Sequence, residues 1–173
     1  MLLARDGVDV NQAASDTGST ALFEAVYHSE YAAIKLLLAH DGIEVNKARA
    51  DGGSTPLYAA CNQGHFGPIK LLLAHDHIDV NKARTGCGST PLYTACCHGH
   101  VDAIKVLLAQ DGIEVNKART DSGETPLYTA CAHGHEEAIK LLLAHDGIEV
   151  NKACTDDGVT PCLLYTSPSP RDA

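Results

Sequence analysis

The side chains best suited to chemistry in this chain are thiols and imidazoles that occur close together. Thiolate and imidazole are preferred protein ligands of zinc, and a tetrahedral site needs about four of them within roughly 2.0 to 2.3 Å of the metal. Zinc binding is therefore the first chemistry to consider. The residues concerned are Cys61 and His65; Cys96, Cys97, His98 and His100; and Cys131, His133 and His135.

Regular spacing argues against a shared metal site. Cys61, Cys96 and Cys131 follow one another at intervals of 35 residues, and the histidines four residues further on keep this interval. Equivalent residues of stacked repeats lie about one helix-packing distance, roughly 8 to 10 Å, apart. That separation is too large for a common metal, and it exceeds the limit of about 7 Å between the Cα atoms of a disulfide. We therefore predict core cysteines, turn-stabilising histidines, no metal and no cofactor.

Common catalytic motifs are absent from the sequence. It contains no Gly-x-x-x-x-Gly-Lys-Ser/Thr phosphate loop, no Gly-x-Ser-x-Gly elbow and no His-Glu-x-x-His helix. Glu136 and Glu137 are adjacent on a predicted helix, so their carboxylates diverge and favour a solvated face over an acid/base pair. We predict that the chain is not an enzyme.

The elements that carry these residues belong to a repeated unit. Val-Asn, Thr-Pro-Leu-Tyr, Gly-His and Ile-Lys-x-Leu-Leu-Ala recur with a period of 35 residues. The predicted repeats are residues 9–43, 44–78, 79–113 and 114–148, with the end of a truncated repeat at 1–8 and the start of a fifth at 149–161.

Each unit predicts two short helices and a loop. Thr55 suits an N-cap and Pro56 the first helical position, because proline has no N–H to lose there. Gly64 suits the end of this helix at positive φ, and a second helix through Ile69 follows. Such short helices are marginal alone, so their apolar faces must be buried against neighbouring units. The stretch of residues 80–89 contains the glycines of a turn or β-hairpin.

Taken in order, Gly-x-Thr-Pro-Leu, Ala-Cys/Ala-x-x-Gly-His, Ile-x-x-Leu-Leu and Val-Asn resemble the ankyrin repeat over roughly residues 1 to 161. The resemblance implies an all-α repeat solenoid of stacked helix-turn-helix units with projecting β-hairpin loops. The family period is about 33 residues, so we expect slightly larger loops here. Where the family has His after Thr-Pro-Leu, this chain has Tyr58, Tyr93 and Tyr128, with Phe23 in the first unit. A row of phenols is expected to replace the His contacts, by packing and by a hydroxyl that needs a partner if buried.

The two ends of the chain depart from this pattern. Met1 to Val10 closely matches the residues leading to Val150, so we expect a fragment of a longer array. Residues 162–173 resemble the conceptual translation of a sequencing-library adapter, and we expect a non-native, disordered tail there. The alternative is a genuine disordered tail rich in Pro and Ser.

Composition disfavours several classes of partner. Lys plus Arg total 13 against 22 Asp plus Glu, and the net charge of −9 disfavours binding to nucleic acid. No apolar run approaches the roughly 18 residues needed to span a membrane. The seven cysteines follow the repeat rather than a disulfide framework, and no secretory signal precedes the first repeat. We expect a monomer in an intracellular compartment, cytoplasmic or nuclear.

Basic residues recur at two repeat positions. Such a row could meet an acidic peptide, but exposed charges that keep the loops soluble are the favoured interpretation. The residues are Lys47, Lys82, Lys117 and Lys152, with Arg49, Arg84 and Arg119.

The predicted function is a non-catalytic scaffold that binds another protein; the alternative is a passive spacer array within a larger multidomain protein. The resemblance implies that contacts come from hairpin tips and from the exposed end of the first helix, on the concave face. In this chain those positions vary between otherwise copied units, and Tyr27 and the histidines are expected to contribute most affinity. The candidate contact residues are Asp16, Thr17, Ser19, Tyr27, His28, Asp51, Gly52, Ser54, Asn62, Gln63, Gly86, Cys87, Ser89, Cys97, His98, Asp121, Ser122, Glu124, Ala132 and His133.

Overall fold

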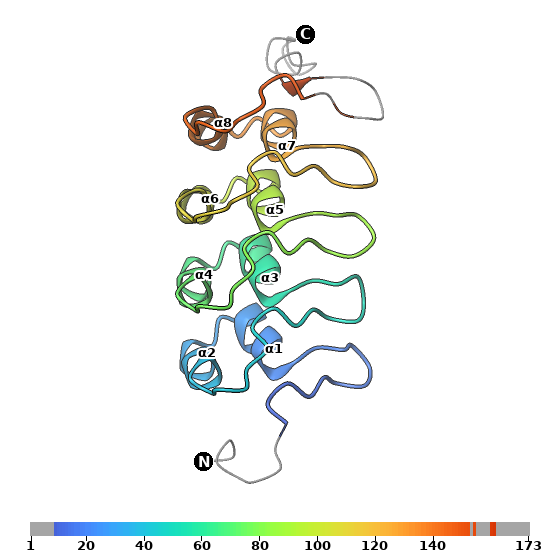
Figure 1. Cartoon of the computed structure of the whole chain (residues 1–173), viewed down its shortest axis with the longest axis vertical. Coiled ribbons are helices and arrows are strands. Elements are labelled where there is room, and N and C mark those ends of the chain that lie inside the picture. Colours follow the sequence, from blue (N-terminus) through green and yellow to red (C-terminus); the bar gives the residue numbers. More distant parts are fainter. Residues whose placement is uncertain (1–8, 153, 155–159, 162–173) are drawn as a thin grey trace.

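The computed structural model describes residues 9–152, 154, 160 and 161. Figure 1 shows a column of stacked repeats, in which one row of helices lies between a second row and a set of projecting loops. The inner helices are α1 (Ala21–Tyr27), α3 (Pro56–Gln63), α5 (Pro91–Cys97) and α7 (Pro126–Ala132). The outer helices are α2 (Tyr31–Leu38), α4 (Phe66–Leu73), α6 (Val101–Leu108) and α8 (Glu136–Leu143).

The inner helices begin at capped turns, as the Thr-Pro pairs predict. The side-chain oxygen of Thr55 accepts a hydrogen bond from the Tyr58 N–H at 3.1 Å, and Thr90 accepts one from the Tyr93 N–H at 3.1 Å. These bonds satisfy N–H groups that have no partner inside the helix. Gly64 ends α3 with a φ of 71°, which confirms the predicted end of that helix.

Stacking buries one continuous apolar core. Each inner helix packs on the next inner helix, and each outer helix on the next outer helix. Ile69, Ile104, Cys61 and Cys96 are wholly buried, and burial raises the pKa of both thiols far above the ordinary range. Because the helices are only 7 or 8 residues long, this packing rather than helix propensity stabilises them. The predicted all-α solenoid is confirmed.

The loops project from the stack as expected, but they are held by turns. Within the described residues the structure has no strand, only an isolated bridge between Ala13 and Thr20. In the second repeat the Arg49 N–H donates to the Ser54 carbonyl oxygen at 2.9 Å, which closes a loop too short for a ladder. Gly53 has a φ of 68°, and a Cβ there would lie 2.7 Å from the backbone nitrogen of the next loop. Glycine thus lets successive loops stack closely.

Some sequence predictions fall on other parts of the chain. Residues 1–8, residues 162–173 and, within 149–161, residues 153 and 155–159 lie outside the described residues. Among the residues that are described, no helix combines the length and the apolar character needed to cross a membrane.

Candidate functional site

One asparagine in each repeat fastens that repeat to the next. Asn81 Nδ2 donates to the Gly112 carbonyl oxygen at 2.7 Å, while Asn81 Oδ1 accepts from the Glu114 N–H at 2.9 Å. Asn46 makes the equivalent pair of bonds at 2.6 and 2.9 Å. The Val-Asn pair, which marks the period in the sequence, therefore has a structural role, and its amide is already occupied.

The histidines that follow glycine also join neighbouring repeats. His100 Nε2 lies 3.1 Å from the carbonyl oxygen of Asn62, and His135 Nε2 lies 3.0 Å from that of Cys97. Both bonds run to the end of the preceding inner helix, so these imidazoles do more than the turn stabilisation predicted for them. His75 does stabilise a turn, because its Nδ1 accepts the N–H two residues further on at 3.3 Å.

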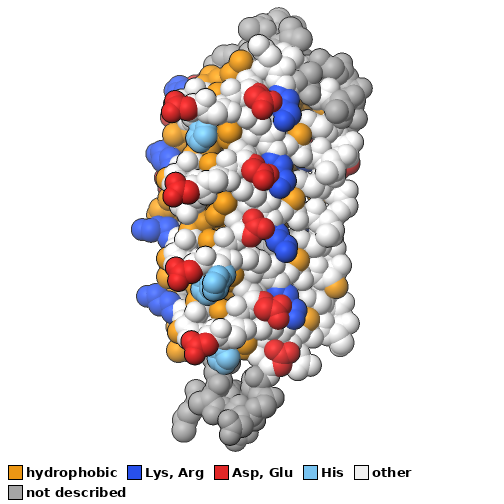
Figure 2. Space-filling model, in the orientation of Figure 1, with side chains coloured by type: hydrophobic (Ala, Val, Ile, Leu, Met, Phe, Trp, Pro, Cys, Tyr) orange, Lys and Arg blue, Asp and Glu red, His pale blue; other side chains and the backbone are white. Residues whose placement is uncertain are grey.

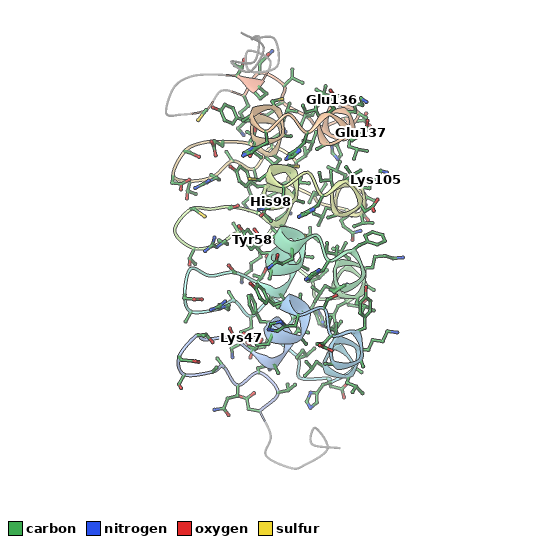
Figure 3. The ribbon with its side chains drawn as sticks, turned by 180° about the vertical axis from the view of Figure 1, so that it is seen from behind. Lys47, Tyr58, His98, Lys105, Glu136 and Glu137 are labelled. Carbon is green, nitrogen blue, oxygen red and sulfur yellow. The ribbon has the colours of Figure 1, made fainter. Side chains whose placement is uncertain are left out.

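The predicted row of aromatic rings is present, and arginines of the following repeats cover it. The guanidinium carbon of Arg84 lies 5.3 Å from the ring centroid of Tyr58, labelled in Figure 3, and that of Arg119 lies 5.5 Å from the ring of Tyr93. The Tyr93 hydroxyl donates to Glu124 at 2.5 Å. Burial first, and then the bond to Glu124, raises the pKa of Tyr93 to about 12. These contacts occupy the place that the sequence resemblance gives to histidine.

Acidic neighbours pair with five of the seven residues of the predicted basic row. Lys117 Nζ lies 2.7 Å from Glu114, and Lys47 (Figure 3) pairs in the same way with the acid three residues before it. Arg119 Nε donates to Asp121 at 2.9 Å and holds the pKa of that carboxyl below its usual value. Figure 2 shows acidic and basic side chains beside one another down the column. The arginines in addition contact rings of the preceding repeats, a role that the sequence did not suggest for them.

The clustered imidazoles and thiols do not converge on a metal position. The ring centroids of His98 and His100 are 5.7 Å apart, and those of His133 and His135 are 6.0 Å apart. In the part of the chain that the structure describes, no three His, Cys, Asp or Glu side chains are placed to hold a metal ion.

The candidate contact residues form two rows that run along the stack. The first row, the loop tips, consists of residues 16–17, 51–52, 86–87 and 121–122. The second row, the inner-helix ends, consists of residues 27–28, 62–63, 97–98 and 132–133. All of these residues are exposed or half-buried, and Figure 1 shows that the loops all project from the same side of the inner helices.

Four candidate contact residues are placed less favourably. Ser19 and Ser89 are each only 4% exposed, because they directly precede the capping threonines where the chain enters the helix. Ser54, at the same repeat position, is half-buried. Glu124 is engaged with Tyr93. We therefore leave these residues out of the two rows.

The inner-helix ends carry imidazole and amide groups that can form hydrogen bonds. His98, on the end of α5 in Figure 3, has its Nε2 3.2 Å from Asn62 Oδ1. Burial, followed by the nearby imidazoles of His100, His133 and His135, lowers the pKa of His98. The end of α5 therefore offers an imidazole whose neutral form is favoured, beside the amide of Asn62.

Sequence reasoning missed two exposed aromatic side chains on the outer helices. Tyr31 of α2 is 49% exposed and Phe66 of α4 is 41% exposed. The signal was variation between repeats, since this position is Tyr31, Phe66, Val101 and Glu136 in turn. The hairpin tips and first helices, which the family resemblance suggests as contact sites, do not include this position.

Comparison with known families gives one match. Residues 46–119, 78–154 and 116–164 each match the family model described as Ankyrin repeats (3 copies). The three segments overlap and together cover more than half of the 173 residues. A search of curated proteins gave no match to the chain.

Proposed function

Because the chain belongs to the ankyrin repeat family, we propose that it is a non-catalytic scaffold that binds another protein along its loop tips and inner-helix ends. Members of this family are generally protein–protein interaction modules. The proposal includes a monomeric chain acting inside the cell, in the cytoplasm or nucleus. Support for that compartment comes from the thiols, because Cys61 and Cys96 are free and buried and reducing compartments keep cysteines in this form.

The residues that hold the repeats together and those that vary between repeats are largely separate sets. The polar groups of the first set contact residues of neighbouring repeats, as in Asn81, His100 and Arg119. Tyr27 and Gln63, in contrast, are exposed at the inner-helix ends. The second set can therefore change without loss of the stack, as a binding surface on a rigid scaffold requires. This separation is the observation that carries the proposal.

Tyr27 is the strongest single anchor on this surface. Its ring is 41% exposed, and it is held in place by stacking at 6.3 Å on Phe23 and by an edge contact at 5.3 Å with His28. A fixed aromatic ring loses little conformational entropy on binding, and tyrosine is enriched among residues that dominate interface energies.

The test is affinity capture with the full chain and a variant in which Tyr27, Gln63 and His98 are all changed to alanine. We expect wild type to retain a partner in a stoichiometric amount at high salt, and the triple variant to lose it. Lys105→Ala, on the outer side of the stack in Figure 3, is the matched control and should retain the partner. Circular dichroism melts must show that the variants remain folded.

Two outcomes would contradict the proposed function. Equal retention by the triple variant would show that the partner binds elsewhere. Failure of wild type to retain any partner at a stoichiometric level would favour a chain that acts only as a spacer.

A further inference from the structure

A second surface, separate from the loop tips and inner-helix ends, lies on the outer helices of the first two repeats. It consists of Tyr31 and Lys35 on α2, and Phe66, Gly67 and Lys70 on α4; we call it the outer aromatic patch. In each helix the aromatic residue and the lysine are four residues apart, so they share one helix face. The patch thus has an aromatic row and a basic row.

Gly67 shapes this patch. A Cβ at position 67 would lie within bonding distance of the Tyr31 hydroxyl and would overlap its ring. The Tyr31 phenol therefore lies across the first turn of α4, where only glycine leaves room for it. Glycine within a helix costs about 1 kcal/mol relative to alanine. Glycine is nevertheless present at position 67, and the Tyr31 side chain that it accommodates remains 49% exposed.

The later repeats lack this arrangement although they are otherwise close copies. The positions of Phe66 and Gly67 become Val101 and Asp102 in the third repeat, and in the fourth they become the adjacent glutamates labelled in Figure 3. The fold therefore does not require aromatic side chains here, and it tolerates a charge at the same place. Exposed aromatic residues that the fold does not need are typical of contact sites.

Charge within the patch favours an acidic partner. Among the described residues, no carboxylate lies within 4.0 Å of the ammonium group of Lys35 or Lys70. Lys70 Nζ lies 5.6 Å from the Phe66 ring centroid, so the cation borders the aromatic surface directly. The equivalent lysine of α8, in contrast, is paired with Glu137 and lowers the pKa of that carboxyl. The first two repeats therefore present unneutralised positive charge beside exposed rings.

We propose that the outer aromatic patch binds an acidic segment of another protein, whose apolar side chains contact Tyr31 and Phe66 and whose carboxylates pair with Lys35 and Lys70. The net charge of −9 means that the rest of the chain repels such a segment. Recognition is therefore local, and the repulsion favours a segment that stays on the outer aromatic patch, where apolar rings and ammonium groups lie together.

The probe is a fluorescein-labelled helical peptide with glutamate on one face and leucine and phenylalanine on the other. Its control has lysine in place of every glutamate. Fluorescence anisotropy with the full chain should show saturable binding of the acidic peptide only. Added salt should weaken this binding, because exposed charge pairs are screened.

Tyr31→Glu together with Phe66→Glu is the test variant, since Glu136 shows that this position accepts glutamate without loss of the fold. We expect the double variant to bind the acidic peptide at least about tenfold more weakly, equivalent to about 1.4 kcal/mol. Val101→Glu makes the same change outside the patch and should bind like wild type. Equal circular dichroism melts would confirm that all three proteins are folded.

Several results would overturn the inference. They are unchanged affinity of the double variant, equal binding of the basic peptide, or no saturable binding by wild type. Sedimentation that shows self-association of wild type, lost in the double variant, would assign the patch to a second copy instead. The variant with alanine at Tyr27, Gln63 and His98 should still bind the peptide, so failure of the proposed function and failure of this inference are distinguishable.

Discussion

The junction between the second and third repeats and the junction between the third and fourth are built from the same contacts but differ in their polar groups. In both, an arginine of the later repeat covers a tyrosine of the earlier one. At the second of these junctions Tyr93 also donates to Glu124, whereas Ser89 stands at the position of Glu124 in the first. Arg119 pairs with Asp121, whereas in the third repeat, beside Arg84, the residue equivalent to Asp121 is Gly86.

This difference shows that a junction can be altered without altering the fold. In a solenoid each repeat contacts only its neighbours, so stability is approximately a sum of repeat and junction terms. Copied apolar residues provide the common part of each junction. A few substituted polar residues then add a local network to one junction, and the others are unaffected.

Truncation of the apolar residues that all junctions share should lower the free energy of unfolding most, and by similar amounts at the two junctions. Leu72→Ala and Leu107→Ala each remove a wholly buried side chain, and each should lower the free energy of unfolding by about 2 to 5 kcal/mol. Urea denaturation followed by circular dichroism measures both. A difference above about 1 kcal/mol between them would show that the two junctions do not share one core.

Arginine truncation should separate the junctions. Arg119→Ala removes a ring contact and an ion pair, and we expect a loss of about 1 to 2 kcal/mol. Arg84→Ala removes the ring contact and a bond at 3.3 Å to the Gly52 carbonyl oxygen, with an expected loss of about 0.5 to 1 kcal/mol. The same urea titrations apply, and an equal loss would contradict the difference in polar groups.

Removal of one tyrosine hydroxyl at each junction should give a smaller difference in stability loss between the two junctions. Tyr93→Phe removes the hydroxyl that donates to Glu124, although Arg119 remains 3.6 Å from that carboxylate, and should cost about 1 kcal/mol. Tyr58→Phe deletes the same atom where no glutamate stands opposite, and should cost at most about 0.5 kcal/mol. Thermal melts of the two variants check the comparison, which fails if Tyr58→Phe proves the more damaging.

Acidification should produce the smallest effect. The pKa of folded His98 lies below its unfolded value of about 6.5, so the unfolded chain binds the proton first. The stability contributed by neutral His98 is therefore fully present above the unfolded pKa. It is lost as the pH falls from the unfolded pKa through the folded pKa. His98→Gln, which copies Gln63 of the second repeat, should reduce the loss measured by melts at about pH 7.5 and about pH 5.5. An unchanged pH dependence would assign the loss to the other imidazoles.

Much of the fold follows from residues with strong local preferences. Thr55, Pro56 and Gly64 define α3 in the sequence because capping, proline geometry and positive φ act within a few residues. The period of 35 residues then predicts stacking, since no single unit can bury its apolar face. The lack of strands in the described loops was harder to foresee, because it depends on where each loop closes, as at the bond between Arg49 and Ser54.

The candidate site was less predictable because burial of a polar residue depends on the neighbouring repeat. Ser19 and Ser89 adjoin the variable loop residues in sequence but are buried in the structure. The partners of Asn81 and His100 are in other repeats, and spacing alone does not show which atoms meet. Comparison of the repeats in the sequence distinguishes Tyr31, but its contact with α4 depends on how the two outer helices pack.

The buried thiols inside the stack can report local opening of the repeats. Cys61 and Cys96 are wholly buried, and burial raises the pKa of both thiols, so alkylating reagents reach neither group in the closed stack. Alkylation of each thiol therefore requires the helices around it to separate. The labelling rates of Cys61 and Cys96, read by mass spectrometry, therefore time the opening of two neighbouring repeats in an unmodified chain.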